Sequence, residues 1–160
     1  MPIPPFIQEL RDRVGTHPLW LSGVTAVVVR DDEVLMIRRA DNGRWAPVAG
    51  IIEPGEHPAD TAEREVLEEA GVVVEVERVA GIDVSAPVTY DTGDAAQYLV
   101  VVMRCRWLSG EAYPADGEAT EARWVPADAL AQLDPALSVA SLRRIGWALQ
   151  EDTAAAFRRA

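Results

Sequence analysis

Three carboxylates near position 65 stand at a spacing that suits a metal ion. Glu65, Glu68 and Glu69 lie at positions i, i+3 and i+4, so on a helix they share one face. Like charges at this spacing repel by roughly 0.2–0.5 kcal/mol per exposed pair. The carboxylates also lie near the helix C-terminus, where the helix dipole disfavours negative charge. A hard divalent cation with oxygen ligands reverses that preference. The spacing therefore predicts a metal site, although the pattern taken alone is more often a solvated acidic helix face.

The helix that must carry these carboxylates is predicted over residues 58–70. Pro58 suits the first turn, where its missing N–H costs nothing, and Gly71 suits the left-handed position just past the end. Apolar residues at helical spacing predict the face that packs on a sheet; they are Ala59, Ala62, Val66 and Ala70.

The stretch around this helix resembles the Nudix box, Gly-x5-Glu-x7-Arg-Glu-U-x-Glu-Glu-x-Gly-U, where U is a bulky aliphatic residue. Every defined position is filled, by Gly50, Glu56, Arg64, Glu65, Val66, Glu68, Glu69, Gly71 and Val72. The predicted order of strands is also similar to that family, so the resemblance extends over roughly residues 20–133.

The resemblance implies a metal site with Mg²⁺ or Mn²⁺ as cofactor. It assigns Glu65, Glu68 and Glu69 as metal ligands, and the carbonyl of Ala49 as a further ligand. The family usually has Gly where this chain has Ala49, with Pro directly before it, whereas Pro47 is shifted here by one place.

The resemblance also implies structural and catalytic roles around the metal. Glu56 and Arg64 are expected to brace the box through charge-assisted hydrogen bonds, Gly50 to allow close backbone approach, and Gly71 to end the helix. Arg64 is grouped with Glu68 and Glu69 as catalytic.

A carboxylate must take a proton from the attacking water. Members of the family use either a box Glu or a Glu on a later loop. Here the loop 115–121 is acidic, and Glu118 is the first choice for the later base, with Glu121 the second. An exposed acidic turn is an equally good interpretation of this loop.

Five residues near the box are candidates for substrate binding. Arg38, Arg39 and Arg44 suit bidentate contacts to phosphates, with surface placement as the alternative. Trp45 and Tyr90 suit stacking on a base, with packing as the alternative.

The function predicted is that of a Mg²⁺-dependent Nudix hydrolase, which cleaves the pyrophosphate bond of a nucleoside diphosphate linked to another moiety. Within the family, a Pro near the position of Pro87 indicates ADP-ribose as the substrate, and a Tyr near that of Tyr90 indicates dinucleoside polyphosphates. An (oxidised) nucleoside triphosphate is an equally open substrate. Two alternatives remain on the same fold: a Nudix-fold domain that binds or senses nucleotides with weak catalysis, and an isoprenoid-diphosphate isomerase. The isomerase needs a catalytic Cys near the box, whereas Cys105 lies in a predicted strand and is interpreted as a core thiol.

The predicted order, with one central helix between sheet segments, favours an α/β sandwich with a mixed β-sheet over a doubly wound parallel sheet, because too few strands alternate with helices. The resemblance implies that it is a Nudix-type α/β/α sandwich with a catalytic loop–helix–loop. Besides 58–70, the expected helices cover residues 6–14, 127–133 and 137–157. The expected strands cover 24–29, 34–37, 72–76, 79–89, 96–107 and 122–125, with a loop over 40–55. The chain is divided into an N-terminal helix and lead-in (1–19), the Nudix domain (20–133) and a C-terminal helix packed on it (134–160).

Charge and composition exclude several partners. The net charge is −11, which disfavours binding to nucleic acid or an anionic membrane, since both are polyanions. The chain has no Lys, so neither a P-loop nor a lysine Schiff base can form. A single Cys allows no intrachain disulfide, which suits a cytoplasmic location. The expected partner is a small nucleotide, and a homodimer is left open.

Overall fold

A computed structural model describes residues 3–151 and 153–157. Its helices are α1 (Pro5–Val14), α2 (Pro58–Ala70), the 3-10 helix η1 (Ala127–Gln132) and α3 (Val139–Leu149). Its strands are β1 (Leu19–Arg30), β2 (Glu33–Arg39), β3 (Trp45–Ala46), β4 (Val48–Ile51), β5 (Val73–Val84), β6 (Val88–Thr89), β7 (Ala95–Ser109), β8 (Ala119–Pro126) and β9 (Ala156–Phe157).

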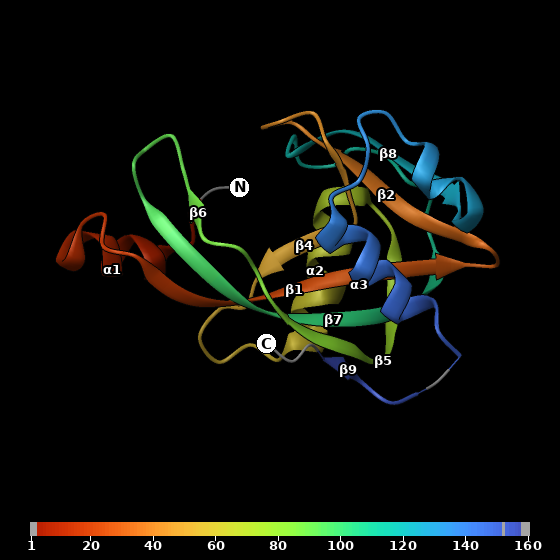
Figure 1. Cartoon of the computed structure of the whole chain (residues 1–160), viewed down its shortest axis with the longest axis horizontal. Helices are drawn as coiled ribbons and strands as arrows, with labels where there is room; N and C mark the ends of the chain where they lie inside the picture. Colours follow the sequence, from red (N-terminus) through yellow and green to blue (C-terminus); the bar gives the residue numbers. More distant parts are fainter. Residues whose placement is uncertain (1–2, 152, 158–160) are drawn as a thin grey trace.

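The strands form one mixed sheet. Its main path runs β3-β2-β1-β7-β5-β9, and β4, β6 and β8 pair with β1, β7 and β2 respectively. β1 is parallel to β7 and antiparallel to β2 and β4. Figure 1 shows α3 in front of this sheet and α2 behind it. The predicted α/β/α sandwich with a mixed sheet is therefore confirmed.

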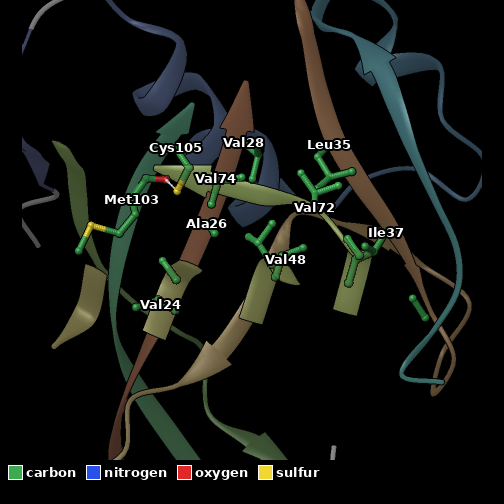
Figure 2. Packing of buried hydrophobic residues seen from close by; sticks show 14 residues of the cluster. Val24, Ala26, Val28, Leu35, Ile37, Val48, Val72, Val74, Met103 and Cys105 are labelled. Atoms are coloured by element: carbon green, nitrogen blue, oxygen red, sulfur yellow. Dashed lines mark hydrogen bonds between the residues drawn. The ribbon is translucent and has the colours of Figure 1, made fainter. Parts of the chain in front are cut away.

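Alternation along β1 builds a core on each face of the sheet, because successive side chains of a strand point to opposite sides. Val24, Ala26 and Val28 pack with the buried residues of α2 (Figure 2). Val27 and Val29 pack with the buried residues of α3. Cys105 lies fully buried on the α2 side (Figure 2), as its interpretation as a core thiol predicts.

The C-terminal helix is shorter than predicted. It was expected over 137–157, but it ends at Leu149, and Ala156–Phe157 pairs with β5 as a strand. Two arginines of the sheet supply the reason. Arg78 donates to the carbonyls of Trp147, Ala148 and Gln150, and Arg104 donates to that of Ala148. The last carbonyls of α3 are thus satisfied by distant side chains, and the chain turns away. Residue 152 of the predicted helix, like 1, 2 and 158–160 of the two end segments, lies outside the described residues.

Three other boundaries differ from prediction. The expected loop over 40–55 contains β3 and β4, whose partners β2 and β1 lie elsewhere in the sequence. The strand expected over 72–76 and the first part of the one expected over 79–89 form a single strand, β5, because register shifts against β7 absorb the irregular pattern, while residues 88–89 form the separate strand β6. Residues 127–132 form a 3-10 helix. None of the helices in the described part of the chain has the length and apolar character needed to cross a membrane.

Candidate active site

Helix α2 has the bounds that its sequence predicts, with Pro58 at the start and Gly71 past the end. Gly71 is left-handed, at φ 67°, and its N–H donates to the carbonyl of Leu67 at 3.0 Å. The face of α2 that packs on the sheet brings two of the three carboxylates with it. Glu65 is 6% exposed and Glu69 is 4% exposed, while the side chain of Glu68 is 53% exposed. The three predicted ligands are therefore not equivalent in burial.

Close approach of β4 and α2 explains the glycine that begins the box. A Cβ atom placed on Gly50 would lie 2.1 Å from both Cδ and Oε1 of Glu65, where no atom fits. The neighbouring Ala49 lies in β4, opposite Thr25 of β1. Among the described residues only Asp31 combines a side chain with a positive φ, so Ala49 has an ordinary backbone conformation.

Arg64 connects most of the box carboxylates. It donates to both oxygens of Glu56, at 2.8 and 3.1 Å, in a bidentate pair. Its Nη1 also donates to Glu65 at 2.9 Å and to Glu68 at 3.0 Å. These hydrogen bonds lower the pKa of Glu56 to about 2 and link the loop before α2 to the helix.

Burial disfavours the ionised form of the two buried carboxylates. Desolvation by burial raises the pKa of Glu65 to about 7, although Arg64 opposes the shift. Desolvation also raises the pKa of Glu69 to about 8, and the nearby charges of Glu65, Glu118 and Asp116 add to it. An added cation would be strongly stabilised here.

A cavity of about 700 Å³ opens beside these carboxylates, between the C-terminal end of α2, the end of β2 and the loop before β8. Its lining is Ile37, Arg39, Ala40, Asp41, Glu68, Glu69, Asp116, Gly117 and Glu118. Three segments far apart in the sequence thus bring acidic side chains and one guanidinium to a single space.

The acidic loop is tied to both walls of this cavity. The N–H of Ala115 donates to the carbonyl of Glu69 at 3.1 Å, and the N–H of Ala40 donates to the carbonyl of Glu118 at 2.8 Å. Glu118, the first choice for a later base, lines the cavity, whereas Glu121, the second choice, pairs with Arg38 at 2.8 Å and is not part of the lining. Asp116 also lines the cavity, and the sequence did not single it out. The dipeptide Asp116-Gly117 is typical of a turn, and it is the sequence feature that could have indicated this residue.

The three candidate arginines separate by position. Arg39 lines the cavity and makes a bidentate pair with Asp41, at 2.9 and 2.7 Å. Arg38 donates to the carbonyl of Gly43 as well as to Glu121. Arg44 is exposed and is not part of the lining. Of the three, Arg39 alone faces the cavity.

Neither candidate aromatic lines the cavity. Trp45 is 3% exposed, its Nε1 donates to the carbonyl of Asp134 at 3.1 Å, and Arg123 lies 4.5 Å from its ring centre. This burial corrects the stacking alternative for Trp45 and favours the packing one. Tyr90 follows β6, its hydroxyl 2.7 Å from that of Tyr98. Tyr90 is likewise not part of the cavity lining.

The donor set suits a hard divalent cation, since every acidic group around the cavity is a carboxylate. Across residues 3–151 and 153–157, however, no three His, Cys, Asp or Glu side chains already converge as a metal site. Glu65 and Glu68 each accept a hydrogen bond from Nη1 of Arg64 instead.

Comparison with known proteins gives concordant results. Residues 20–144 match the family model of the NUDIX domain. A MutT-like protein of Streptomyces ambofaciens is 34% identical over 116 residues, 72% of this chain and 70% of that protein. The NAD-capped RNA hydrolase NudC of Pseudomonas syringae is 32% identical over 132 residues, 81% of this chain but only 44% of that protein. The chain thus spans less than half of NudC. A solved NUDIX hydrolase from Nitrosomonas europaea has the same fold, with a TM-score of 0.65 at 24% identity over 81% of this chain and 88% of that one.

Proposed function

The chain belongs to the Nudix hydrolase family, and on that basis we propose that it is a Mg²⁺-dependent pyrophosphohydrolase acting on a nucleoside diphosphate linked to another moiety. One observation carries the proposal. Buried Glu69 faces a cavity that it shares with Glu68, Asp116 and Glu118 and with the guanidinium of Arg39. Carboxylates can bind a cation and an arginine can bind a phosphate, and metal-assisted cleavage of a phosphoanhydride uses both kinds of group.

Glu65, Glu68 and Glu69 would hold the cation. When bound, Mg²⁺ neutralises charge on a pyrophosphate and lowers the pKa of a coordinated water. Arg64 donates to only one oxygen each of Glu65 and Glu68, so the second oxygen of each carboxylate would be available to the cation. The bidentate pair of Arg64 with Glu56 would hold the guanidinium in place beside them.

Arg39 is the residue of this chain that we expect to bind a substrate phosphate. Its pair with Asp41 is half exposed, with side chains 44% and 56% accessible, so a doubly charged phosphate can compete for the guanidinium. Glu118 stands across the same cavity as the general base, with Glu68 and Glu69 as the alternatives.

The substrate is proposed as a class: ADP-ribose, a dinucleoside polyphosphate or an (oxidised) nucleoside triphosphate. NudC is named for NAD-capped RNA, which presents the same kind of pyrophosphate bond. The net charge of −11 weighs against a long polyanion and favours the small nucleotides.

The test is a panel of these nucleotides, scored for Mg²⁺-dependent release of phosphate-containing products. We expect Glu68→Gln and Glu69→Gln to lower kcat by orders of magnitude while the protein stays folded. Asp60→Asn is the matched control, since Asp60 lies on the same helix but is exposed and outside the cavity.

Unchanged turnover in both glutamine variants would refute the ligand assignment. A wild-type protein that binds a panel member, measured by calorimetry, but hydrolyses none would instead support the nucleotide-sensing alternative. Ala49, in place of the family's usual Gly, is the feature that keeps this alternative in view.

A further inference from the structure

The loop between β7 and β8 crosses the C-terminal end of α2 at very short range. A Cβ atom on Gly71 would lie 2.1 Å from Cε1 of Tyr113 and 2.8 Å from its Cδ1 and Cζ. The tyrosine ring therefore lies directly on the backbone of the last box glycine. A Cβ on Gly110, at the start of the loop, would lie 2.7 Å from the carbonyl oxygen of Gly71. The loop and the helix end are in contact along their backbones.

Hydrogen bonds join the same two segments. The N–H of Tyr113 donates to the carbonyl of Ala70, and the N–H of Ala115 donates to that of Glu69, both at 3.1 Å. These carbonyls belong to the last turn of α2, where no helical partner is available. The loop thus caps the helix that carries the carboxylates. Directly after Ala115 it continues to Asp116 and Glu118 on the cavity wall.

From this arrangement we propose that Tyr113 is a positioning residue, whose ring holds the loop 110–118 on the end of α2 and so keeps Asp116 and Glu118 beside Glu69. The proposal rests on the proposed function, because it concerns the spacing of the groups assigned there to catalysis. It also gives Gly71 a second role, since both its left-handed φ of 67° and the ring above it exclude a side chain.

The exposure of Tyr113 separates positioning from simple stabilisation. Tyr113 is 56% exposed and belongs to none of the buried core clusters of the described chain. Removing its ring should therefore change global stability little, while releasing the loop locally. A displacement of about 1 Å between reacting groups can lower a rate by about 100-fold.

The first test compares Tyr113→Ala with Tyr113→Phe, which keeps the ring. In Tyr113→Ala we expect kcat to fall by about 10- to 100-fold with much less change in KM. We also expect faster hydrogen exchange at the amides of Tyr113 and Ala115, while Tyr113→Phe stays near wild type in both. Leu108→Ala is the control, because Leu108 is an exposed apolar residue just before the same loop.

The second test uses Gly71→Ala. If the new methyl group displaces the ring, both substitutions release the same contact. The kcat of the double variant Gly71→Ala/Tyr113→Ala should then be no lower than that of whichever single variant has the lower kcat. Gly43→Ala measures the stability cost of the backbone alone, since Gly43 has the same φ of 67° and open space around its Cβ position.

Wild-type kcat and wild-type amide exchange in Tyr113→Ala would overturn the proposal, and so would equal losses in Tyr113→Phe and Tyr113→Ala. If the wild-type protein hydrolyses no nucleotide, the proposed function fails, but amide exchange still tests whether the ring holds the loop. Faster exchange in Tyr113→Ala would then support the clamp alone, and unchanged exchange would refute it.

Discussion

Without a divalent cation, the protein should lose stability as the pH rises from 6 to 8. Burial raises the pKa of Glu65 to about 7 and that of Glu69 to about 8, from a usual value of 4.5 in an unfolded chain. The folded protein therefore binds these protons more tightly than the unfolded chain does. The stabilisation is fully present below pH 4.5 and is lost as the pH rises toward 8.

The size of the effect follows from these pKa values. For Glu69, the difference in proton binding between pH 6 and pH 8 amounts to roughly 2 kcal/mol, and Glu65 adds roughly 1 kcal/mol. In a protein of this size each kcal/mol shifts the melting temperature by about 2–4 °C, so Glu69 alone should lower Tm by about 4–8 °C. Bound Mg²⁺ or Mn²⁺ should reverse the loss, and by more at pH 8 than at pH 6, because protons compete with the metal for the same oxygens.

Thermal unfolding in EDTA and in excess Mg²⁺, at both pH values, measures these quantities. Glu69→Gln should raise Tm in EDTA at pH 8, reduce its dependence on pH and weaken the response to Mg²⁺. Asp60→Asn, exposed on the same helix, should behave as wild type. A wild-type Tm in EDTA that is the same at pH 6 and pH 8, or a Glu69→Gln variant with the full pH dependence, would show that burial does not raise the pKa of this carboxylate.

Two further predictions concern packing. The side chain of Asp83 is 3% exposed and pairs with two arginines of α3, so Asp83→Asn should lower the free energy of unfolding by about 3–5 kcal/mol. Glu75 lies on the same strand in a pair whose side chains are 54% exposed, so Glu75→Gln should lower it by no more than about 1 kcal/mol. Equal losses in the two variants, measured by urea unfolding, would contradict this contrast. Gly50→Ala should displace Glu65 and abolish the rise in Tm that Mg²⁺ induces. Gly55→Ala, at a positive φ but in open space, should keep that rise. A full Mg²⁺ response in Gly50→Ala would be inconsistent with the close contact between Gly50 and Glu65.

Local signals in the sequence were enough to locate α2 and the box. Pro58 and Gly71 act on their own turns of the helix, so the bounds of α2 follow from nearby residues. The i, i+3, i+4 spacing of the carboxylates is likewise a property of one helix. The β-branched run at 24–29 was visible as a strand, and the order of strands and helices predicted the sandwich that the two cores confirm.

Contacts between distant segments decided what surrounds the carboxylates. Arg38 and Arg39 are neighbours in sequence, and the register of β2 against β8, which shifts between them, determines that Arg39 lines the cavity. Trp45 is buried because of its tertiary neighbours, and nothing in its local sequence distinguishes a packing tryptophan from a stacking one.

By itself, then, the sequence determined the family, the helix that carries the three box carboxylates and the acidic character of the candidate site, because each depends on residue type and short-range spacing. Only the tertiary structure decided that Glu69 is buried while Glu68 is exposed, that Arg64 holds the box carboxylates together, and that the loop carrying Glu118 rests on the end of α2. The physical reason is that burial, pairing and loop placement arise from side chains and backbone groups far apart along the chain.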